Sequence, residues 1–277
     1  MQEFMKTEEK FAKLPEILRP MEKVIVAFSG GVDSAFVLAV AKQILDNNVL
    51  AVTAHSEVYA QSELEGAQAL ARTLGVEHKI IRTRELDDPR YVNNPPERCF
   101  HCKQELFGKL IPIAKELGFS FIVDGTNASD IKDFRPGMRA HKDFGVRSPL
   151  LEAGLIKDEI RTLSKQIGLP TWNKPAMACL ASRLPYGSSI TVEKLRQVEH
   201  AENFLYRFGF KQLRVRNYDG TARIEVLPEQ MQILLANREE IVAHLKSLGF
   251  KYVTMDLQGF RSGSMNEILK KDSLAVR

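Results

Sequence analysis

The stretch KVIVAFSGGVDS, residues 23–34, joins a continuous apolar run to a loop that contains two glycines. An apolar run of this length is typical of a strand buried on both faces of a parallel sheet. Residues 35–45 have a helical pattern, so the loop is predicted to lie at a strand-to-helix junction. Gly30 and Gly31 allow the backbone to approach a ligand closely, and the free N–H groups at a helix N-terminus attract an anion. The stretch therefore predicts a pyrophosphate-binding loop.

The loop differs from two common phosphate-binding motifs. It has no lysine in the place that a Walker motif requires, and it does not match G-x-G-x-x-G. Ser29 and Ser34 would add hydroxyl donors, and Asp33 could hold a Mg²⁺ ion that bridges pyrophosphate oxygens. A glycine-rich turn without a ligand is the remaining alternative.

Strands and helices alternate along the first part of the chain. Further strands are predicted over residues 49–54, 78–82 and 120–123, and further helices over 7–18, 63–74 and 103–117. This order predicts an α/β fold with a doubly wound parallel sheet and helices on both faces. After about residue 175 the order becomes α-β-β-α-β, with a long helix over 191–208, a hairpin that turns at Asp219-Gly220, a helix over 228–248 and a strand over 251–257. We therefore expect one domain over residues 1–175 and a smaller α+β domain over 176–277.

Composition limits the functional classes. The 277 residues are 44% hydrophobic and 27% charged, with a net charge of +4, which suits a phosphate-bearing small molecule better than a nucleic acid. The N-terminal stretch is charged and amphipathic, and no apolar run is long enough to span a membrane. We expect a cytoplasmic homo-oligomer without a membrane partner. Its three cysteines are too few for a disulfide framework.

Two segments resemble the PP-loop ATP-pyrophosphatase superfamily, whose enzymes adenylate an oxygen of their substrate and release pyrophosphate. S-G-G-x-D-S, residues 29–34, resembles the superfamily's phosphate loop. DGTNASD, residues 124–130, follows a later predicted strand, as does the segment that lines the nucleotide pocket in these enzymes. The resemblance implies that Gly125 and Thr126 help to bind ATP.

Three C-terminal segments resemble the LarE family, which makes thiocarboxylates during biosynthesis of the nickel-pincer nucleotide cofactor. They are NKPAMACLASRLPYGSSIT (173–191), RVRNYDGTARIEV (214–226) and YVTMDLQGFRSGSMN (252–266). The resemblance extends from about residue 23 to residue 266. It implies that ATP adenylates a carboxylate of pyridinium-3,5-biscarboxylic acid mononucleotide, that sulfur from a sulfide donor replaces AMP, and that the sequence repeats at the second carboxylate.

The same resemblance implies the substrate side of the site. Ser182 and Arg183 resemble the family's Ser-Arg pair, and Glu202 matches an acidic position. Arg214 and Arg216 alternate on a predicted strand, so they face the same way and could clamp a substrate phosphate. Without the resemblance, a solvated strand face would explain the two arginines and a surface helix position would explain Glu202.

The cysteines indicate which branch of the family the chain resembles. In one branch a single cysteine gives up its own sulfur, and the matching position here is Ala178, with Cys179 one residue later. PERCFHCK, residues 96–103, adds Cys99 and Cys102. Three thiolates can hold a [4Fe–4S] cluster with one open iron for sulfide, as in the cluster-dependent branch. We therefore predict one site from Cys99, Cys102 and Cys179; zinc, buried thiols, or sacrifice of the Cys179 sulfur are the alternatives.

Three other functions are compatible with a PP-loop. A tRNA thiolase would need a strongly basic surface, which a net charge of +4 does not indicate. An amide-forming synthetase would need no set of three cysteines, and a nucleotide sensor would leave those cysteines unexplained. The sequence therefore favours an ATP-dependent sulfur transferase.

Overall fold

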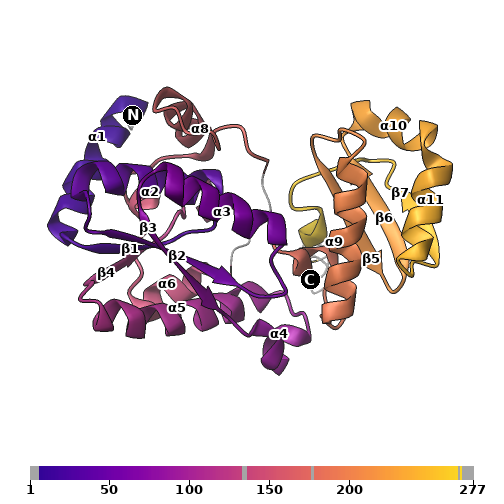
Figure 1. Cartoon of the computed structure of the whole chain (residues 1–277), viewed down its shortest axis with the longest axis horizontal. Helices are drawn as coiled ribbons and strands as arrows, with labels where there is room; N and C mark the ends of the chain where they lie inside the picture. Colours follow the sequence, from indigo (N-terminus) through magenta and orange to yellow (C-terminus); the bar gives the residue numbers. More distant parts are fainter. Residues whose placement is uncertain (1–5, 133–135, 176–177, 268, 270–277) are drawn as a thin grey trace, which may run out of the picture. The chain divides into compact units, whose positions relative to one another are not determined.

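The computed structural model describes residues 6–132, 136–175, 178–267 and 269, and it divides the chain into two units. The first unit comprises Met1–Glu85 and Glu97–Met177, and the second comprises Leu86–Pro96 and Ala178–Arg277. Figure 1 labels the elements of both units. The sequence did not predict that residues 86–96 belong with the second unit.

The first unit is built on a four-stranded parallel sheet, in the order β3-β2-β1-β4. In this register Val24 of β1 lies beside Val49 on one side and Phe121 on the other. The strands are β1 (Val24–Ala27), β2 (Val49–His55), β3 (Glu77–Arg82) and β4 (Phe121–Val123). Because the chain order reverses between β1 and β4, the sheet is doubly wound and the predicted fold class is confirmed.

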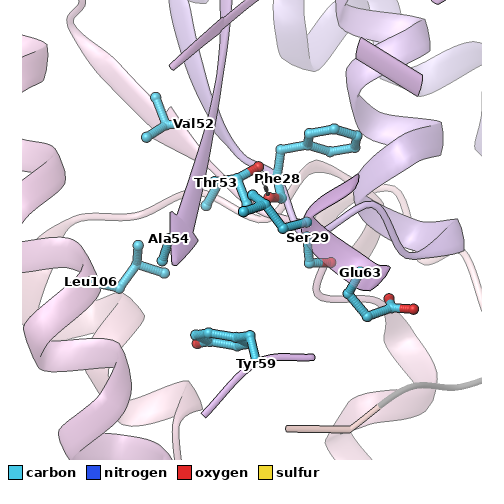
Figure 2. Close-up of a pocket in the computed structure, with 10 residues that line it drawn as sticks. Phe28, Ser29, Val52, Thr53, Ala54, Tyr59, Glu63 and Leu106 are labelled. Carbon is cyan, nitrogen blue, oxygen red and sulfur yellow. Dashed lines mark hydrogen bonds between the residues drawn. The ribbon is translucent and has the colours of Figure 1, made fainter. Parts of the chain in front are cut away.

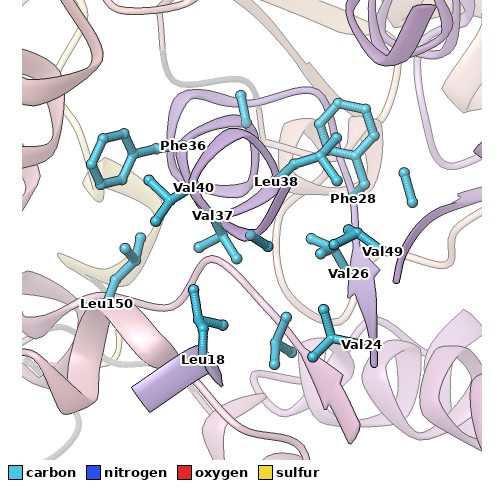
Figure 3. Close-up of a cluster of buried hydrophobic side chains, with 14 of the residues drawn as sticks. Leu18, Val24, Val26, Phe28, Phe36, Val37, Leu38, Val40, Val49 and Leu150 are labelled. Carbon is cyan, nitrogen blue, oxygen red and sulfur yellow. The ribbon is translucent and has the colours of Figure 1, made fainter. Parts of the chain in front are cut away.

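Helices cover both faces of this sheet (Figure 1). The helices of the first unit are α1 (Thr7–Leu18), α2 (Val32–Leu45), α3 (Gln61–Thr73), α5 (Arg98–Glu116), α6 (Met138–Phe144), α7 (Pro149–Glu152) and α8 (Lys157–Gln166). Val24 and Val26 pack with α1, α2, α3 and α8, whereas Ile25 packs with α5 and α6. Figure 3 shows the first of these cores around α2. The apolar run of β1 is therefore buried on both faces, as its sequence predicts.

The second unit contains a three-stranded sheet in the order β5-β6-β7. Its strands are β5 (Leu213–Tyr218), β6 (Thr221–Val226) and β7 (Tyr252–Met255), and its helices are α4 (Pro89–Val92), α9 (Val192–Tyr206), α10 (Met231–Ala236) and α11 (Arg238–Ser247). β5 and β6 form the predicted antiparallel hairpin, and β7 runs parallel to β6. The predicted continuous helix over 228–248 is wrong, because it is interrupted at Asn237, whose side-chain amide donates to the carbonyl of Ile233 at 2.8 Å.

Residues 86–96 are tied to the second unit through backbone hydrogen bonds. The N–H of Ile190 donates to the carbonyl of Val92 at 2.9 Å, and the N–H of Gly187 donates to the carbonyl of Asn94 at 3.0 Å. The buried Asn94 side chain donates to the carbonyl of Pro185 at 2.8 Å.

None of the helices in the described ranges combines the length and the apolar character that crossing a membrane requires.

Candidate functional site

The predicted phosphate loop is the segment SGGVDS, residues 29–34. It leads from β1 into the first turn of α2 at the carboxyl edge of the parallel sheet. Gly31 is the N-cap of α2, so the first N–H groups of that helix face the loop. The hydroxyls of Ser29 and Ser34 lie 3.0 Å apart, and the Ser34 hydroxyl also accepts the N–H of Ser29 at 3.2 Å. Gly30 has a φ of +70°, and a Cβ atom there would lie 3.0 Å from the Cβ of Ala67. The loop therefore needs glycine at position 30.

Gly125, which follows β4, lies against the backbone of the phosphate loop. A Cβ atom at this position would lie only 2.6 Å from the backbone nitrogen of Ser34 and 2.9 Å from the carbonyl carbon of Asp33. The DGTNASD segment after β4 thus packs directly against the first turn of α2. The structure brings Gly125 against the loop residues, as the sequence assigned, and Thr126 follows it with its hydroxyl on Asp124.

A cavity of about 100 Å³ opens beside the loop, at the ends of β1 and β2 (Figure 2). Most of its wall is apolar, and its lining residues are Ala27, Phe28, Ser29, Val52, Thr53, Ala54, Tyr59, Glu63, Leu64 and Leu106. The Thr53 hydroxyl donates to the carbonyl of Phe28 at 2.7 Å and lies 2.7 Å from Nε2 of His78. Burial, with the charge of Arg72 in addition, lowers the pKa of His78, which favours a neutral imidazole behind the wall. An apolar pocket next to an anion-binding loop suits a nucleotide base.

Two lysines far away in the sequence contact the phosphate loop, and sequence reasoning missed both. Lys157, the first residue of α8, forms an ion pair with Asp33. Lys174 donates to a carboxylate oxygen of Glu63 at 2.9 Å and to the carbonyl of Gly30 at 3.3 Å. Lys174 belongs to the segment 173–191 that resembles the LarE family. That resemblance was the one feature of the sequence that could have marked it as a site residue.

Asp124 anchors the neighbouring strand end. Its carboxylate accepts hydrogen bonds from the hydroxyls of Thr126 and Ser148, both at 2.8 Å, and lies 2.6 Å from Nε2 of His141 and 3.2 Å from Nζ of Lys103. Burial alone would raise the pKa of Asp124. The His141 hydrogen bond and the Lys103 charge outweigh burial and hold this pKa well below its usual range. The carboxylate is therefore an anion at neutral pH, and it pairs with Lys103 and His141 at the end of β4.

Cys99 and Cys102 lie in the first two turns of α5, three residues apart and thus on one side of the helix. Cys99 is exposed, whereas Cys102 is half-buried. The Cys102 sulfur lies 3.3 Å from the hydroxyl of Tyr59, which also lines the cavity, and 3.7 Å from Oε1 of the buried Glu85. Cys179 is half-buried and belongs to the second unit. Within the described ranges, no group of three or more His, Cys, Asp or Glu side chains is arranged to hold a metal ion.

The second unit buries an arginine that sequence reasoning placed in the site. The Arg183 side chain is fully buried and forms two hydrogen bonds with the Glu202 carboxylate, at 3.0 and 2.8 Å. It also donates to the carbonyls of Ala178 and Cys179, at 2.6 and 3.1 Å. The Glu202 charge raises the pKa of Arg183 despite the opposing effect of burial. Arg183 therefore holds the backbone of the Cys179 segment.

Arg214 and Arg216 are buried as well. Arg216 forms two hydrogen bonds with Glu225, at 3.0 and 2.8 Å, and donates to the carbonyl of Ser182 at 2.7 Å. Burial and the neighbouring guanidinium of Arg183 lower the pKa of Arg214 to about 10, so it remains a cation at neutral pH. The solvated strand face that would have explained both arginines is wrong, as is a surface position for Glu202, which is 3% exposed. Sequence reasoning missed Glu225.

Comparisons with known proteins agree with this geometry. The model of the NAD synthase family matches residues 12–91, which include β1, the phosphate loop and β2. A pyridinium-3,5-bisthiocarboxylic acid mononucleotide synthase from Lactiplantibacillus plantarum is 39% identical, over 96% of this chain and 97% of its own length. An uncharacterized protein of Synechocystis sp. is 44% identical, over 95% and 99%. A glutamine-hydrolyzing GMP synthase from Aeropyrum pernix is 28% identical, over 64% and 38%.

The phosphate loop, the doubly wound sheet and the NAD synthase match define the class, an ATP-dependent enzyme with a PP-loop domain. The full-length similarity to the L. plantarum synthase narrows this class to one family. The chain belongs to the LarE family.

Proposed function

We propose that this chain is an ATP-dependent sulfur transferase that converts the carboxylates of pyridinium-3,5-biscarboxylic acid mononucleotide into thiocarboxylates. The observation that carries the proposal is the 39% identity to a named synthase over nearly the whole of both chains. The phosphate loop, the adjoining cavity and the buried arginines supply groups that such a reaction requires.

The first step is adenylation, in which a substrate carboxylate oxygen attacks the α-phosphorus of ATP and the bond to the β-phosphate breaks. Pyrophosphate leaves, and an acyl adenylate remains. The N–H groups at the start of α2 and the hydroxyls of Ser29 and Ser34 bind the phosphates, and the cavity beside Phe28 and Thr53 receives the base. These groups stabilise the charge that develops on the leaving pyrophosphate.

Asp33 is the residue that would hold a Mg²⁺ ion bound with ATP. Its carboxylate lies in the first turn of α2 and is 23% exposed, which suits an oxygen ligand that shares the ion with phosphate oxygens. In the structure this carboxylate is ion-paired with Lys157, so Mg²⁺ would compete with an ammonium group for it. The ion would neutralise charge on the phosphates as they separate.

The substrate phosphate is assigned to the arginines of the second unit. Burial and the adjacent guanidinium groups lower the pKa of Arg214, which means that they disfavour its charge. An anion bound there would relieve this cost, and a mononucleotide supplies one. Arg216 donates to the Ser182 carbonyl, so Ser182 lies beside this arginine group. Arg183, paired with Glu202, positions the Cys179 segment through its backbone carbonyls.

In the second step hydrosulfide attacks the acyl carbon of the adenylate, AMP leaves, and the thiocarboxylate retains the sulfur. We propose that Cys99, Cys102 and Cys179 would hold a [4Fe–4S] cluster, which when bound would supply a site for exogenous sulfide. Cys99 and Cys102 lie on one side of α5, so both thiols could act as its ligands. The Tyr59 hydroxyl would orient the Cys102 sulfur. Direct use of the Cys179 sulfur, or thiolation of tRNA, would be the competing outcomes.

The experiment labels both oxygens of the substrate carboxylates with ¹⁸O and follows the label after turnover with ATP and sulfide. Adenylation transfers one carboxylate oxygen to AMP, so AMP becomes labelled while pyrophosphate stays unlabelled. Unlabelled AMP, or AMP formation that does not depend on the mononucleotide, would contradict the proposal. Substituting tRNA for the mononucleotide in the same assay tests the thiolase alternative.

A further inference from the structure

The phosphate loop contains no lysine, yet an ammonium group contacts its backbone. Lys174 donates to the carbonyl of Gly30, the loop residue with a positive φ. This contact joins residues 144 positions apart, so it is a product of the fold rather than of the loop sequence. Its Nζ atom would lie 3.8 Å from a Cβ at Gly66 of α3, so Lys174 lies between the loop and α3.

Lys174 is only partly buried, and besides the Gly30 carbonyl its ammonium group contacts the Glu63 carboxylate. Its side chain is 23% exposed and the side chain of its partner Glu63 is 22% exposed. Glu63 also lines the cavity beside Ser29 (Figure 2). Because the pair is partly open to solvent and lies at the loop, a phosphate oxygen bound there can compete with Glu63 for the ammonium group.

Lys157 provides a less direct contact. It pairs with the Asp33 side chain, the proposed Mg²⁺ ligand, rather than with the loop backbone. Removing Lys157 would therefore also change the environment of the metal ligand. The hydrogen bonds of Lys174 to Gly30 and Glu63 involve neither Asp33 nor the loop serines, so its contribution to anion binding is separable.

We propose that Lys174 binds the pyrophosphate portion of ATP, in the role that a lysine within the loop plays in Walker-type sites. Pyrophosphate at the loop attracts the ammonium group of Lys174 away from Glu63, and Lys174 then stabilises the pyrophosphate as it leaves. This inference rests on the proposed use of ATP by the phosphate loop. Glu63 is the resting partner that keeps Lys174 at the loop before ATP binds.

A purely structural role would give a different pattern of effects. If Lys174 only fastened the loop to α3, loss of Glu63 would break one of its two contacts, so Glu63→Gln would weaken pyrophosphate binding in the same direction as Lys174→Met. If Lys174 binds phosphate, loss of Glu63 removes a competitor for its ammonium group. Glu63→Gln and Lys174→Met therefore have opposite expected effects.

The test measures binding of inorganic pyrophosphate, ATP and AMP by titration calorimetry with Mg²⁺ present. We expect Lys174→Met to weaken pyrophosphate and ATP by about 10- to 100-fold, as for a charge-assisted hydrogen bond, and to leave AMP unchanged. Lys174→Arg should retain most of the affinity, and Glu63→Gln should bind pyrophosphate at least as tightly as wild type. Lys165→Met removes an equal charge from the exposed side of α8, where Lys165 lies over the Trp172 ring, and serves as the control.

Wild-type pyrophosphate affinity in a folded Lys174→Met variant would overturn the inference, as would equal losses in Lys174→Met and Glu63→Gln. Far-UV circular dichroism establishes folding. If the methionine variant fails to fold, Glu63→Gln still tests the inference, because weaker pyrophosphate binding in that variant would overturn it. Failure of the wild type to bind pyrophosphate and ATP would instead overturn the proposed function.

Discussion

Replacing Glu202 with glutamine should destabilise the second unit strongly. In the structure the fully buried Arg183 guanidinium makes two hydrogen bonds with the Glu202 carboxylate, which also accepts the N–H of Val215 at 2.9 Å. Removing one partner of a buried ion pair leaves an uncompensated charge, at a typical cost of about 3–5 kcal/mol. Glutamine still accepts the Val215 N–H and one guanidinium hydrogen, so we expect a loss of about 3 kcal/mol in the free energy of unfolding.

The matched variants separate charge from packing. Glu202→Leu removes every hydrogen bond and should lie at the upper end of the range, near about 5 kcal/mol. The double variant Arg183→Met with Glu202→Leu leaves neither charge buried, so it should recover most of that loss. With the single variant Arg183→Met, these variants give the coupling between the two positions, which includes the cost of an unpaired buried charge.

The assay is urea unfolding followed by hydrogen exchange of peptides from α9 and β5, because these elements contain Glu202 and Val215. This local readout avoids assuming that the two units unfold together. A loss below about 1 kcal/mol in Glu202→Gln, or a double variant no more stable than the single ones, would refute the reasoning.

Three other predictions concern the remaining parts of the site. Asp33→Ala should abolish pyrophosphate release, because Mg²⁺ and the leaving group lose their anchor; wild-type release at saturating ATP and substrate would exclude this role. Arg214→Ala and Arg216→Ala should weaken the mononucleotide by about 1.5–3 kcal/mol and ATP much less, and equal losses for both ligands would contradict a phosphate clamp. The pKa of Asp124 is lowered in the folded state, so its stabilising contribution is present above about pH 4 and is lost as the pH falls further. Asp124→Asn should therefore reduce the fall in the free energy of unfolding at acid pH, measured by urea unfolding from about pH 7 to about pH 2. An unchanged fall would contradict a stabilising role for the Asp124 carboxylate.

Local patterns predicted the first unit well. The apolar run of β1 and the glycines after it determine backbone geometry within a few residues, so the strand, the loop and α2 follow from short-range rules. The contacts of Lys157 and Lys174 with the loop join residues more than a hundred positions apart. No local pattern specifies such contacts, because they depend on where α8 and the following segment pack.

In the second unit, some buried ion pairs could have been predicted from the sequence and others could not. The hairpin turn at Asp219-Gly220 fixes a register in which Arg214 lies opposite Glu225, so the buried Glu225 could have been found from the sequence. The partnership of Arg183 with Glu202 could not, because a loop residue and a helix residue meet there only through tertiary packing. Asn237 was a usable signal for the break between α10 and α11, because asparagine competes for backbone hydrogen bonds within a helix.

The central claim is that this chain transfers sulfide to an adenylated pyridinium mononucleotide without consuming its own sulfur. The most direct measurement incubates anaerobically reconstituted protein with ATP, Mg²⁺, sulfide and substrate in excess over protein, then records product mass and intact-protein mass. We expect thiocarboxylate in excess over protein, an unchanged polypeptide mass, and no product from Cys99→Ser, Cys102→Ser or Cys179→Ser variants, which should still release pyrophosphate. Product limited to one sulfur per chain, with the polypeptide lighter by the mass of H₂S at Cys179, would contradict the claim.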